Sequence, residues 1–530
     1  MANLVKKLMA ELTAPRAWFL LLLPLFLMLV RCSLATSRTN RARKKRQQQL
    51  VDGHLPPSPP ALPVLGHLHL VGLSLPHVSL RSLAKKHGPD LMLLRLGAMP
   101  VLVVSSPRAA EAVLRTHDHV FASRPHSLAV KIIMYGPCDV GFAPYGDYWR
   151  QLRKLITTHL LSVKKVRSFY LACQEEVSMV MSRIGEAAAA GVAVNMSELL
   201  GSFSNDLMCR AVMGRSYRSE GRNKLFRELV ADTSPLIAGF NVEEFFPFLA
   251  RFGVLSKVVR AKSERVKRRW DDLLDRLIDD HESKYDDTSA SDPKDGDDFI
   301  HVLLSVRQEY GLTREQMKAI LLDLFLAGID TTSSALEFTM AELIRTPRVM
   351  KKLQAEVRSC IPKEQEAVNE ASLADMAYLR AVIKESLRLH PVAPLILPHF
   401  STVSCSIDGY TIPPGVLVLV NAWAMARDAR YWEDAEEFVP ERFVGGGRAM
   451  DVSFKGNDFQ FVPFGAGRRI CPGMNFGVAA VEAMLANLVR RFEWELPPGQ
   501  EGRGIDMSEV FDLVVHRKEK LLLVPKSCTT

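Results

Sequence analysis

The most informative stretch of this chain is Phe464-Gly465-Ala466-Gly467-Arg468-Arg469-Ile470-Cys471-Pro472-Gly473. Its glycines permit a tight turn whose backbone can approach a flat ligand closely. Pro472 and the apolar periodicity of residues 474–491 predict a helix that begins directly after the cysteine. The N–H groups and positive dipole at that helix entrance, together with Arg469, favour a thiolate at Cys471. The stretch therefore predicts a ligating cysteine and not an inert core residue.

The composition is that of a folded protein with a large core. The 530 residues are 48% hydrophobic and 24% charged, which excludes a largely disordered chain, a collagen-like repeat and a polytopic membrane protein. The net charge of +9 comes from the first 50 residues, which hold ten Lys or Arg and one acid, while the remainder is balanced. No nucleic-acid binding is therefore predicted for the body. Eight scattered cysteines without a CxxC pair suit a reducing compartment.

Residues 1–36 are predicted to be an N-terminal signal-anchor, a single transmembrane segment. The apolar run of residues 17–30 is short of the roughly 20 residues that span a bilayer, but extension to residue 36 with snorkelling arginines closes the gap. A cleaved secretory signal is the alternative, because residues 33–35 resemble a small-residue cleavage site. Seven Lys or Arg in residues 31–46 favour the anchor and place the C-terminal part in the cytosol. Residues 37–66 form a basic and Pro-rich linker.

Residues 67–530 are predicted to form one large, mainly α domain with a small β portion. Apolar or alternating runs predict strands at 91–97, 101–105, 405–412 and 416–420. Amphipathic periodicity predicts helices at 108–116, 164–188, 222–236, 256–283, 298–308, 314–345, 348–359, 374–390 and 474–491. The longest of these has clear ends, because Thr313 and Gln316 make a capping box and Pro347 follows the last residues. At about 1.5 Å per residue it is a rod of roughly 48 Å that crosses the domain.

The pattern Phe-x-x-Gly-x-Arg-x-Cys-x-Gly at residues 464–473 resembles the signature of the cytochromes P450, and the resemblance covers residues 50–525. It implies the cytochrome P450 fold, with one large haem-thiolate catalytic domain behind the anchor and haem b (iron protoporphyrin IX) as cofactor. Cys471 is implied to be the axial ligand of the haem iron, as a thiolate that favours O–O cleavage. Phe464, Gly465 and Gly473 are implied to bind the same cofactor.

Four side chains match the family's partners of the haem propionates. They are Trp149 and Arg153, four residues apart on a predicted helix, together with Arg469 and His399. The chemistry is simple, because a guanidinium offers a buried carboxylate two donors in a fixed fork. For His399, a purely structural role is an equal alternative. Phe400 stands where many plant relatives have a basic residue.

Two further stretches occur in the family's order. Glu385-Ser386-Leu387-Arg388 places Glu385 and Arg388 on one face of a predicted helix. Arg442, in Pro440-Glu441-Arg442-Phe443, resembles the arginine that completes their ion-pair network beside the cysteine loop.

Ala327-Gly328-Ile329-Asp330-Thr331-Thr332 interrupts the regular character of the longest helix. A glycine followed by β-branched and hydroxyl side chains is expected to weaken the helical ladder locally and to make room for water or dioxygen. The resemblance implies that Thr331 positions the oxygen unit and a water molecule, while Asp330 relays protons inward. Two alternative functions would not require Asp330 and Thr331. One is an isomerase or dehydratase of the same fold, and the other is a non-catalytic membrane haem-binding protein.

Electrons are expected from outside the chain, because no dinucleotide-binding fingerprint follows a strand. The implied partner is NADPH-cytochrome P450 reductase in the endoplasmic reticulum membrane, so that NADPH acts indirectly. A basic neighbourhood suits its acidic surface, and consists of Arg150, Lys154, Lys164, Lys165 and Arg167. An ordinary solvated helix face explains the same residues equally well.

The substrate is expected to be a small hydrophobic molecule, oxidised with O2. Family analogy places its pocket among apolar side chains that include Leu324, Phe325, Val392, Ile396 and Leu513. Several stretches, such as residues 77–97 and 455–465, resemble the plant A-type (microsomal) P450s of grasses, notably the indole and indolinone hydroxylases. A plant secondary metabolite of indole or indolinone type is therefore expected. Oxime-metabolising and terpenoid-hydroxylating relatives remain alternatives, because a fold does not determine a substrate.

Overall fold

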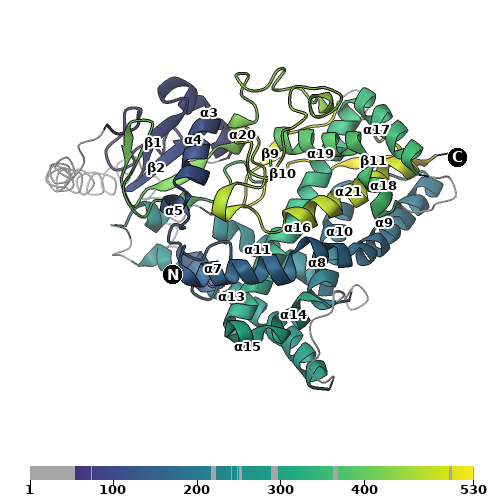
Figure 1. Cartoon of the computed structure of the whole chain (residues 1–530), viewed down its shortest axis with the longest axis horizontal. Coiled ribbons are helices and arrows are strands. Elements are labelled where there is room, and N and C mark those ends of the chain that lie inside the picture. Colours follow the sequence, from purple (N-terminus) through teal and green to yellow (C-terminus); the bar gives the residue numbers. More distant parts are fainter. Residues whose placement is uncertain are drawn as a thin grey trace, which may run out of the picture.

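The computed structural model describes residues 54–72, 74–215, 222–239, 242–247, 249, 253–287, 297–361, 368–500 and 504–528. The predicted anchor (residues 1–36) lies outside the described residues, and so does the linker (residues 37–66) up to residue 53. From residue 54 onward the chain forms a mainly helical body with a smaller β portion, as predicted (Figure 1).

The helices make up most of the body. The longer ones are α3 (Pro76–His87), α7 (Asp147–Leu155), α9 (Tyr170–Ala190), α10 (Met196–Met213), α11 (Arg222–Ala238), α13 (Val254–Asp287), α16 (Arg314–Arg345), α17 (Pro347–Cys360), α19 (Ala377–Leu389) and α21 (Met474–Arg491). Short helices and helical turns connect them: α4 (Pro107–Glu111), η1 (Ala112–Thr116), α5 (Asp118–Phe121), α6 (Leu128–Ile133), η2 (Ile156–Leu160), α8 (Val163–Ser168), α12 (Val242–Phe245), α14 (Phe299–Ser305), α15 (Arg307–Tyr310), α18 (Glu370–Ala374), α20 (Ala422–Met425), η5 (Pro440–Phe443) and η6 (Gly467–Arg469).

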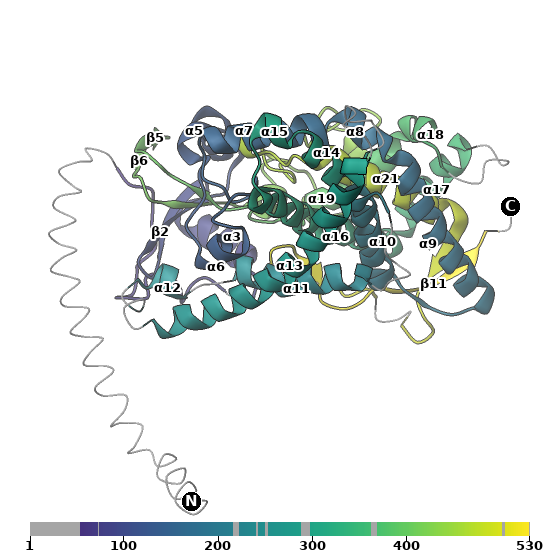
Figure 2. The same cartoon turned by 90° about the horizontal axis from the view of Figure 1, so that it is seen from below.

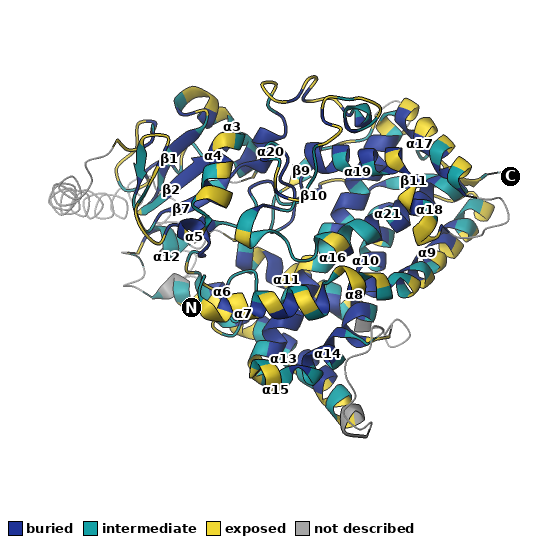
Figure 3. Ribbon diagram, viewed as in Figure 1, coloured by how far each residue is buried: buried dark blue, intermediate teal, exposed yellow. Residues whose placement is uncertain are grey.

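Helix α16 lies at the centre of the core. The Thr313 hydroxyl accepts from the Gln316 N–H at 3.2 Å, and the Gln316 side chain accepts from the Thr313 N–H at 2.8 Å, so the predicted capping box and both helix ends are confirmed. It packs along α10 and also against α21 and α19, and Figure 3 shows α16 and α10 as largely buried. Among the described helices, α16 alone is long and apolar enough for a membrane span, and its place in the core accounts for that hydropathy.

Helix α10 was not among the predicted helices. Its buried residues include Ser204, Asn205 and Asp206 as well as large apolar side chains. Because polar and apolar residues are buried side by side around it, no one-sided apolar stripe marks the helix in the sequence. In Figure 2, α10 and α16 lie at the centre of the body, and α13 runs along its lower edge.

The largest sheet of the β portion lies at one end of the molecule, whereas β9 and β10 lie near the middle and β11 lies toward the C-terminus (Figure 1). A mixed sheet has the order β1-β2-β7-β4, formed by β1 (Leu91–Leu96), β2 (Met99–Val104), β7 (Leu417–Val420) and β4 (His399–Phe400). The β1–β2 hairpin is antiparallel and β2 pairs with β7 in parallel, with Val101 opposite Leu417. The remaining strands form small sheets: β5 (Cys405–Ile407) with β6 (Tyr410–Ile412), β9 (Glu509–Val510) with β10 (His516–Arg517), and β3 (Val194–Asn195), β11 (Leu522–Ser527) and β8 (Phe492–Glu495) in the order β3-β11-β8. The predicted strand 405–412 is thus a hairpin of two short strands.

Candidate active site

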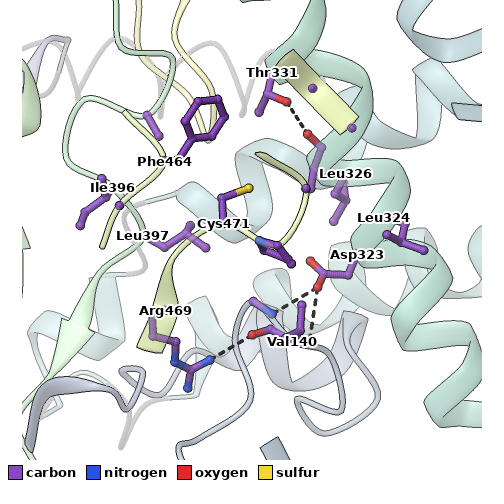
Figure 4. A pocket seen from close by; sticks show the side chains of 18 of the residues that line it. Val140, Asp323, Leu324, Leu326, Thr331, Ile396, Leu397, Phe464, Arg469 and Cys471 are labelled. Carbon is purple, nitrogen blue, oxygen red and sulfur yellow. Dashed lines mark hydrogen bonds between the residues drawn. The ribbon is translucent and has the colours of Figure 1, made fainter. Parts of the chain in front are cut away.

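The loop before α21 places Cys471 on the wall of a cavity of about 280 Å³. The Cys471 N–H donates to the Phe464 carbonyl at 2.9 Å, which closes the loop. Gly465 and Gly467 have φ of 70° and 64°, and a Cβ on Gly467 would come 1.7 Å from the Leu114 carbonyl oxygen. Both glycines are therefore required by the turn. Figure 4 shows the Cys471 sulfur pointing into the space between this loop and α16.

Gly473 differs from the other two loop glycines. Its φ is −87°, and a Cβ there would lie 3.9 Å from the nearest atom outside its chain neighbours, Cys471 Sγ. Nothing in the described chain therefore demands a glycine at this position. The idea that it makes room for a flat ligand stays a prediction.

The surroundings of Cys471 only partly match the prediction of a favoured thiolate. Burial raises the pKa of the Cys471 thiol, whereas the backbone N–H groups of Gly473 and Met474 and the charge of Arg153 lower it. The pKa is raised overall, and the cation that opposes the rise is Arg153, not Arg469 as expected from the sequence. A metal cation at the sulfur would reverse this balance, because a coordinating thiol is deprotonated.

Three arginines line the same cavity. Arg469 donates to the carbonyls of Ala122 at 2.6 Å, Val140 at 3.0 Å and Ala143 at 2.5 Å. Burial lowers the pKa of Arg469 to about 9, and the nearby Arg124 adds to this effect. The guanidinium of Arg153, on α7, makes no hydrogen bond or ion pair with any described side chain, and burial lowers its pKa. Buried guanidinium groups that meet carbonyls or nothing at all suit a ligand that carries carboxylates.

Arg124 is the cavity arginine that sequence reasoning missed. Its side chain donates to the carbonyls of Gly141 at 2.8 Å, Leu397 at 2.9 Å and Pro398 at 2.7 Å, and burial lowers its pKa to about 10. No motif around Arg124 marks it in the sequence. Arg124 supplies a positive charge to the cavity wall, which the uncharged side chain of Phe400 cannot do.

Trp149 and His399 line the cavity, as predicted, but their polar atoms are already engaged. Trp149 Nε1 donates to the Val140 carbonyl at 3.0 Å, and the Arg469 guanidinium lies 4.3 Å from the centre of its ring. His399 Nδ1 lies 3.0 Å from the Phe121 carbonyl, which assigns the proton to Nδ1. Burial lowers the pKa of His399 to about 3, so Nε2 carries a lone pair. In this arrangement neither side chain offers a free donor to a carboxylate.

The predicted ion-pair network forms behind the loop. Arg388 Nε and Nη2 donate to the two Glu385 oxygens at 2.7 and 2.9 Å, and Arg442 Nε lies 3.1 Å from both oxygens. Arg388 also donates to the carbonyls of Ala426, Ala435 and Glu437. Glu385 and Arg388 are 0% exposed, so all this hydrogen bonding takes place out of water.

Helix α16 forms the wall that faces the cysteine loop, with Leu324, Ala327, Gly328 and Thr331 on the cavity. The helix continues without interruption through residues 327–332, so the predicted local weakening is not seen. The Thr331 hydroxyl donates to the Ala327 carbonyl. Gly328 has a packing reason, because a Cβ there would come 2.0 Å from the Met208 methyl group of α10.

Two predicted residues of α16 do not line the cavity. Asp330 lies off its wall, where burial raises its pKa and the nearest charges are those of His516, Asp512 and Arg227. Phe325 is fully buried and stacks on Phe226 at 4.3 Å, so its predicted place in the pocket is wrong. The other predicted pocket residues, Leu324, Val392, Ile396 and Leu513, do line the cavity.

An acidic residue of α16 was also missed. Asp323 lies on the cavity wall, and its Oδ2 accepts from the N–H groups of Val140 and Gly141 at 3.2 Å each (Figure 4). Burial and the neighbouring Asp139 raise its pKa to about 8, so the carboxyl is ionised only in alkaline solution unless a donor reaches it. The sequence signal was an acid within the apolar run 319–327, which is unusual for the buried face of a helix.

Comparison with known proteins identifies the class. The family model described as "Cytochrome P450" matches residues 56–524, and the chain belongs to this family. Its fold is that of a solved zebra fish cytochrome P450 bound to abiraterone, with a TM-score of 0.71, 24% identity and coverage of 86% of this chain and 99% of the other. The family uses haem b with electrons supplied by a reductase, and the chain is a cytochrome P450 monooxygenase.

Similar curated proteins come from Zea mays. The chain is 54% identical to an indole-2-monooxygenase over 96% of its own length and 94% of the relative. It is 52% identical to an indolin-2-one monooxygenase, with coverage of 95% and 94%. A 3-hydroxyindolin-2-one monooxygenase is 50% identical, with coverage of 95% and 93%. These relatives have the monooxygenase class in common and differ in the printed substrate.

Proposed function

We propose that this protein inserts one oxygen atom of O2 into a small indolic substrate, using electrons that originate from NADPH. The observation that carries the proposal is the juxtaposition of Cys471 and Thr331 on facing walls of one largely apolar cavity. The names of the similar maize enzymes add the indolic ring system, because they include indole, indolin-2-one and a hydroxylated indolin-2-one.

In this proposal the chain's own residues hold haem b in the cavity. Cys471 supplies the thiolate for iron, and the loop turn at Gly465 and Gly467 keeps the sulfur in place. Arg153 takes a propionate with donors that no described side chain uses, and Arg124 and Arg469 add positive charge nearby. Trp149 and His399 position the wall, since their N–H groups already hold the carbonyls of Val140 and Phe121. Phe464, which lines the cavity from the loop, would contact the bound cofactor. Bound haem supplies the oxygen chemistry.

Thr331 and Asp330 handle protons. The Thr331 hydroxyl donates to the Ala327 carbonyl, so its lone pairs remain free to accept from a water molecule in the cavity. Asp330 directly precedes Thr331 on α16 but lies off the cavity wall, near His516 and Arg227, where it can exchange protons away from the substrate. The hydroxyl then acts on the cavity wall, and the acid acts beside it but off that wall.

A redox partner, O2 and a small substrate follow from the family. We propose that the partner is NADPH-cytochrome P450 reductase and that residues 1–36 anchor the protein in the lipid of the endoplasmic reticulum membrane. Exposed Arg150 and Lys154 on α7 support a basic docking face. Lys165 does not belong to it, because it is buried, donates to the Asp297 carbonyl at 2.5 Å and lies 5.4 Å from the Phe169 ring centre.

A turnover panel tests the proposal. The full chain is combined with reductase, NADPH and O2, and indole, indolin-2-one, an aromatic oxime and a monoterpenoid are each offered. We expect an oxygenated product from an indolic compound, with one atom of labelled O2 incorporated. A product only from the oxime or the terpenoid would overturn the indolic substrate, and product formation without NADPH would overturn the monooxygenase reaction.

A further inference from the structure

Asp323 occupies a position on the cavity wall that the reaction described above does not use. Among the described residues that line the cavity it is the only one with a carboxyl group. It lies on the same face of α16 as Ala327 and Thr331, at spacings of four residues. Eight residues, or roughly 12 Å along the helix, separate it from Thr331, which leaves room for a bicyclic ring between them.

The two oxygens of Asp323 have different surroundings. Oδ2 accepts both backbone N–H groups, from Val140 and Gly141. Oδ1 accepts no hydrogen bond from any described residue, although the carboxyl lies on the cavity wall. One oxygen thus holds the loop in place, and the other is left as an acceptor.

The loop at residues 139–141 brings a second carboxyl group, that of Asp139, close to Asp323. A Cβ at Gly141 would come 3.1 Å from Asp139 Oδ2 and 3.2 Å from Asp323 Oδ1. Asp139 is 0% exposed, its Oδ2 accepts from the Phe142 N–H at 2.8 Å, and its Oδ1 is buried without a partner. Two carboxyl groups side by side are unfavourable without donors, so an additional donor in the cavity would be stabilising here.

We infer that Asp323 is a specificity residue that accepts a hydrogen bond from the ring N–H of the substrate through Oδ1. The inference rests on the proposed function and names the group that recognises the indolic ring. Indole carries a single polar group, a donor, and the cavity arginines offer only donors in return. With its pKa raised to about 8, Asp323 acts as an acceptor in its ionised form, and that carboxylate is a stronger acceptor than the hydroxyls of Thr331 and Thr332, which share the cavity. Donation to Oδ1 would also oppose the rise in the pKa of Asp323 that burial and Asp139 cause.

A pair of methylated ligands tests this recognition in the wild-type holoprotein. 3-Methylindole keeps the N–H, whereas 1-methylindole has the same added methyl group and lacks the donor. Binding is titrated through the ligand-induced shift of the haem Soret band. Above about pH 8, where the Asp323 carboxyl is ionised, we expect 3-methylindole to bind at least about tenfold more tightly, because one charged hydrogen bond is lost in the other complex. Equal affinities would overturn the inference without the need for any variant.

Asp323→Asn separates recognition from loop support. The amide oxygen can still accept from the Val140 and Gly141 N–H groups, which forces the NH₂ group toward the cavity and replaces an acceptor by a donor. We expect the affinity ratio of the two methylindoles to fall close to one. Asp139→Asn is the matched control, because Asp139 is a buried carboxyl of the same cluster that does not line the cavity, and it should keep the wild-type ratio.

The remaining outcomes separate this inference from the proposed function. A wild-type ratio in Asp323→Asn would overturn the inference and leave Asp323 as a support of the 139–141 loop. No Soret shift with indole, indolin-2-one or either methylindole, in protein with an intact carbon monoxide spectrum, would overturn the indolic substrate and the inference with it.

Discussion

Two groups of arginines, one beside Glu385 and one on the cavity wall, use the same side chain in opposite ways. In the Glu385–Arg388–Arg442 network, carboxylate and guanidinium groups meet at 2.7–3.1 Å and the remaining donors reach carbonyls. On the cavity wall, Arg124 and Arg469 meet carbonyls, and Arg153 meets no described partner. A satisfied buried charge supports the fold, whereas an unsatisfied one costs free energy until an anion arrives. The hydrogen-bond partners of the arginines therefore distinguish the structural Glu385–Arg388–Arg442 network from the binding residues of the cavity wall.

The largest effect is expected from breaking the satisfied network. Glu385→Gln leaves Arg388 and Arg442 without a buried anion and should lower the free energy of unfolding by about 3–5 kcal/mol, measured by urea denaturation. The control is Arg448→Met, whose pair with Glu433 is at 3.2 Å but 86% and 63% exposed, with an expected change within about 0.5 kcal/mol. Similar stabilities of the two variants would contradict the structural role of the network.

A second buried carboxylate, Glu509, should show its contribution to stability in acid. Glu509 Oε2 lies 3.1 Å from His77 Nε2, and Oε1 lies 3.7 Å from His390 Nδ1. Burial alone would raise the pKa of Glu509, but the close approach of His390 and the hydrogen bond with His77 prevail and lower it to about 2. A depressed pKa gives stability above the unfolded value of 4.5 that is lost as the pH falls toward 2.

The Glu509 contribution is expected to be on the order of 2 kcal/mol. Glu509→Gln should remove the part of the acid-dependent loss that occurs between about pH 4.5 and pH 2, followed as the urea midpoint at each pH. Glu495→Gln serves as the control, since its pair with Lys526 is exposed. An unchanged pH profile in Glu509→Gln would refute the assigned role.

On the cavity wall, loss of an arginine is expected to weaken ligand binding without lowering the stability of the fold. Arg153→Met removes a half-buried charge that has no described partner, so the apoprotein should be as stable as the wild type or more stable. The same change removes a propionate partner, and the haem dissociation constant should rise about tenfold, measured by haem transfer to an acceptor protein. A destabilised apoprotein that binds haem normally would place Arg153 with the structural cluster instead.

The smallest effect concerns a neutral group. Thr331→Ala removes the hydroxyl that would hold water beside the substrate, and the ratio of product formed to NADPH consumed should fall severalfold. Thr339→Ala is matched to it, because Thr339 also donates to the carbonyl four residues before it on α16 but is buried away from the cavity. An equal ratio in both variants would remove Thr331 from the proton path.

Local signals predicted the parts of the molecule that local chemistry determines. The ends of α16 followed from the Thr313 capping box and Pro347, and the cysteine loop followed from its glycines. Helix α10 escaped prediction because it is buried around its circumference, with Ser204 and Asn205 among apolar neighbours. Asp323 and Arg124 escaped because their roles depend on the carbonyls and N–H groups of residues 139–141, which approach them only in the folded chain. Phe325 was wrongly predicted to line the pocket together with its neighbour Leu324. Only the packing of Phe325 against Phe226 in the folded chain shows that the two side chains point in different directions.

The account depends most on a bond between the sulfur of Cys471 and haem iron. The direct measurement is the absorption spectrum of the reduced full-length protein with carbon monoxide, for the wild type and for Cys471→Ser. We expect the red-shifted Soret band of thiolate ligation in the wild type and its loss in the variant. A wild-type spectrum typical of histidine or water ligation, or a shifted band that persists in Cys471→Ser, would contradict the account.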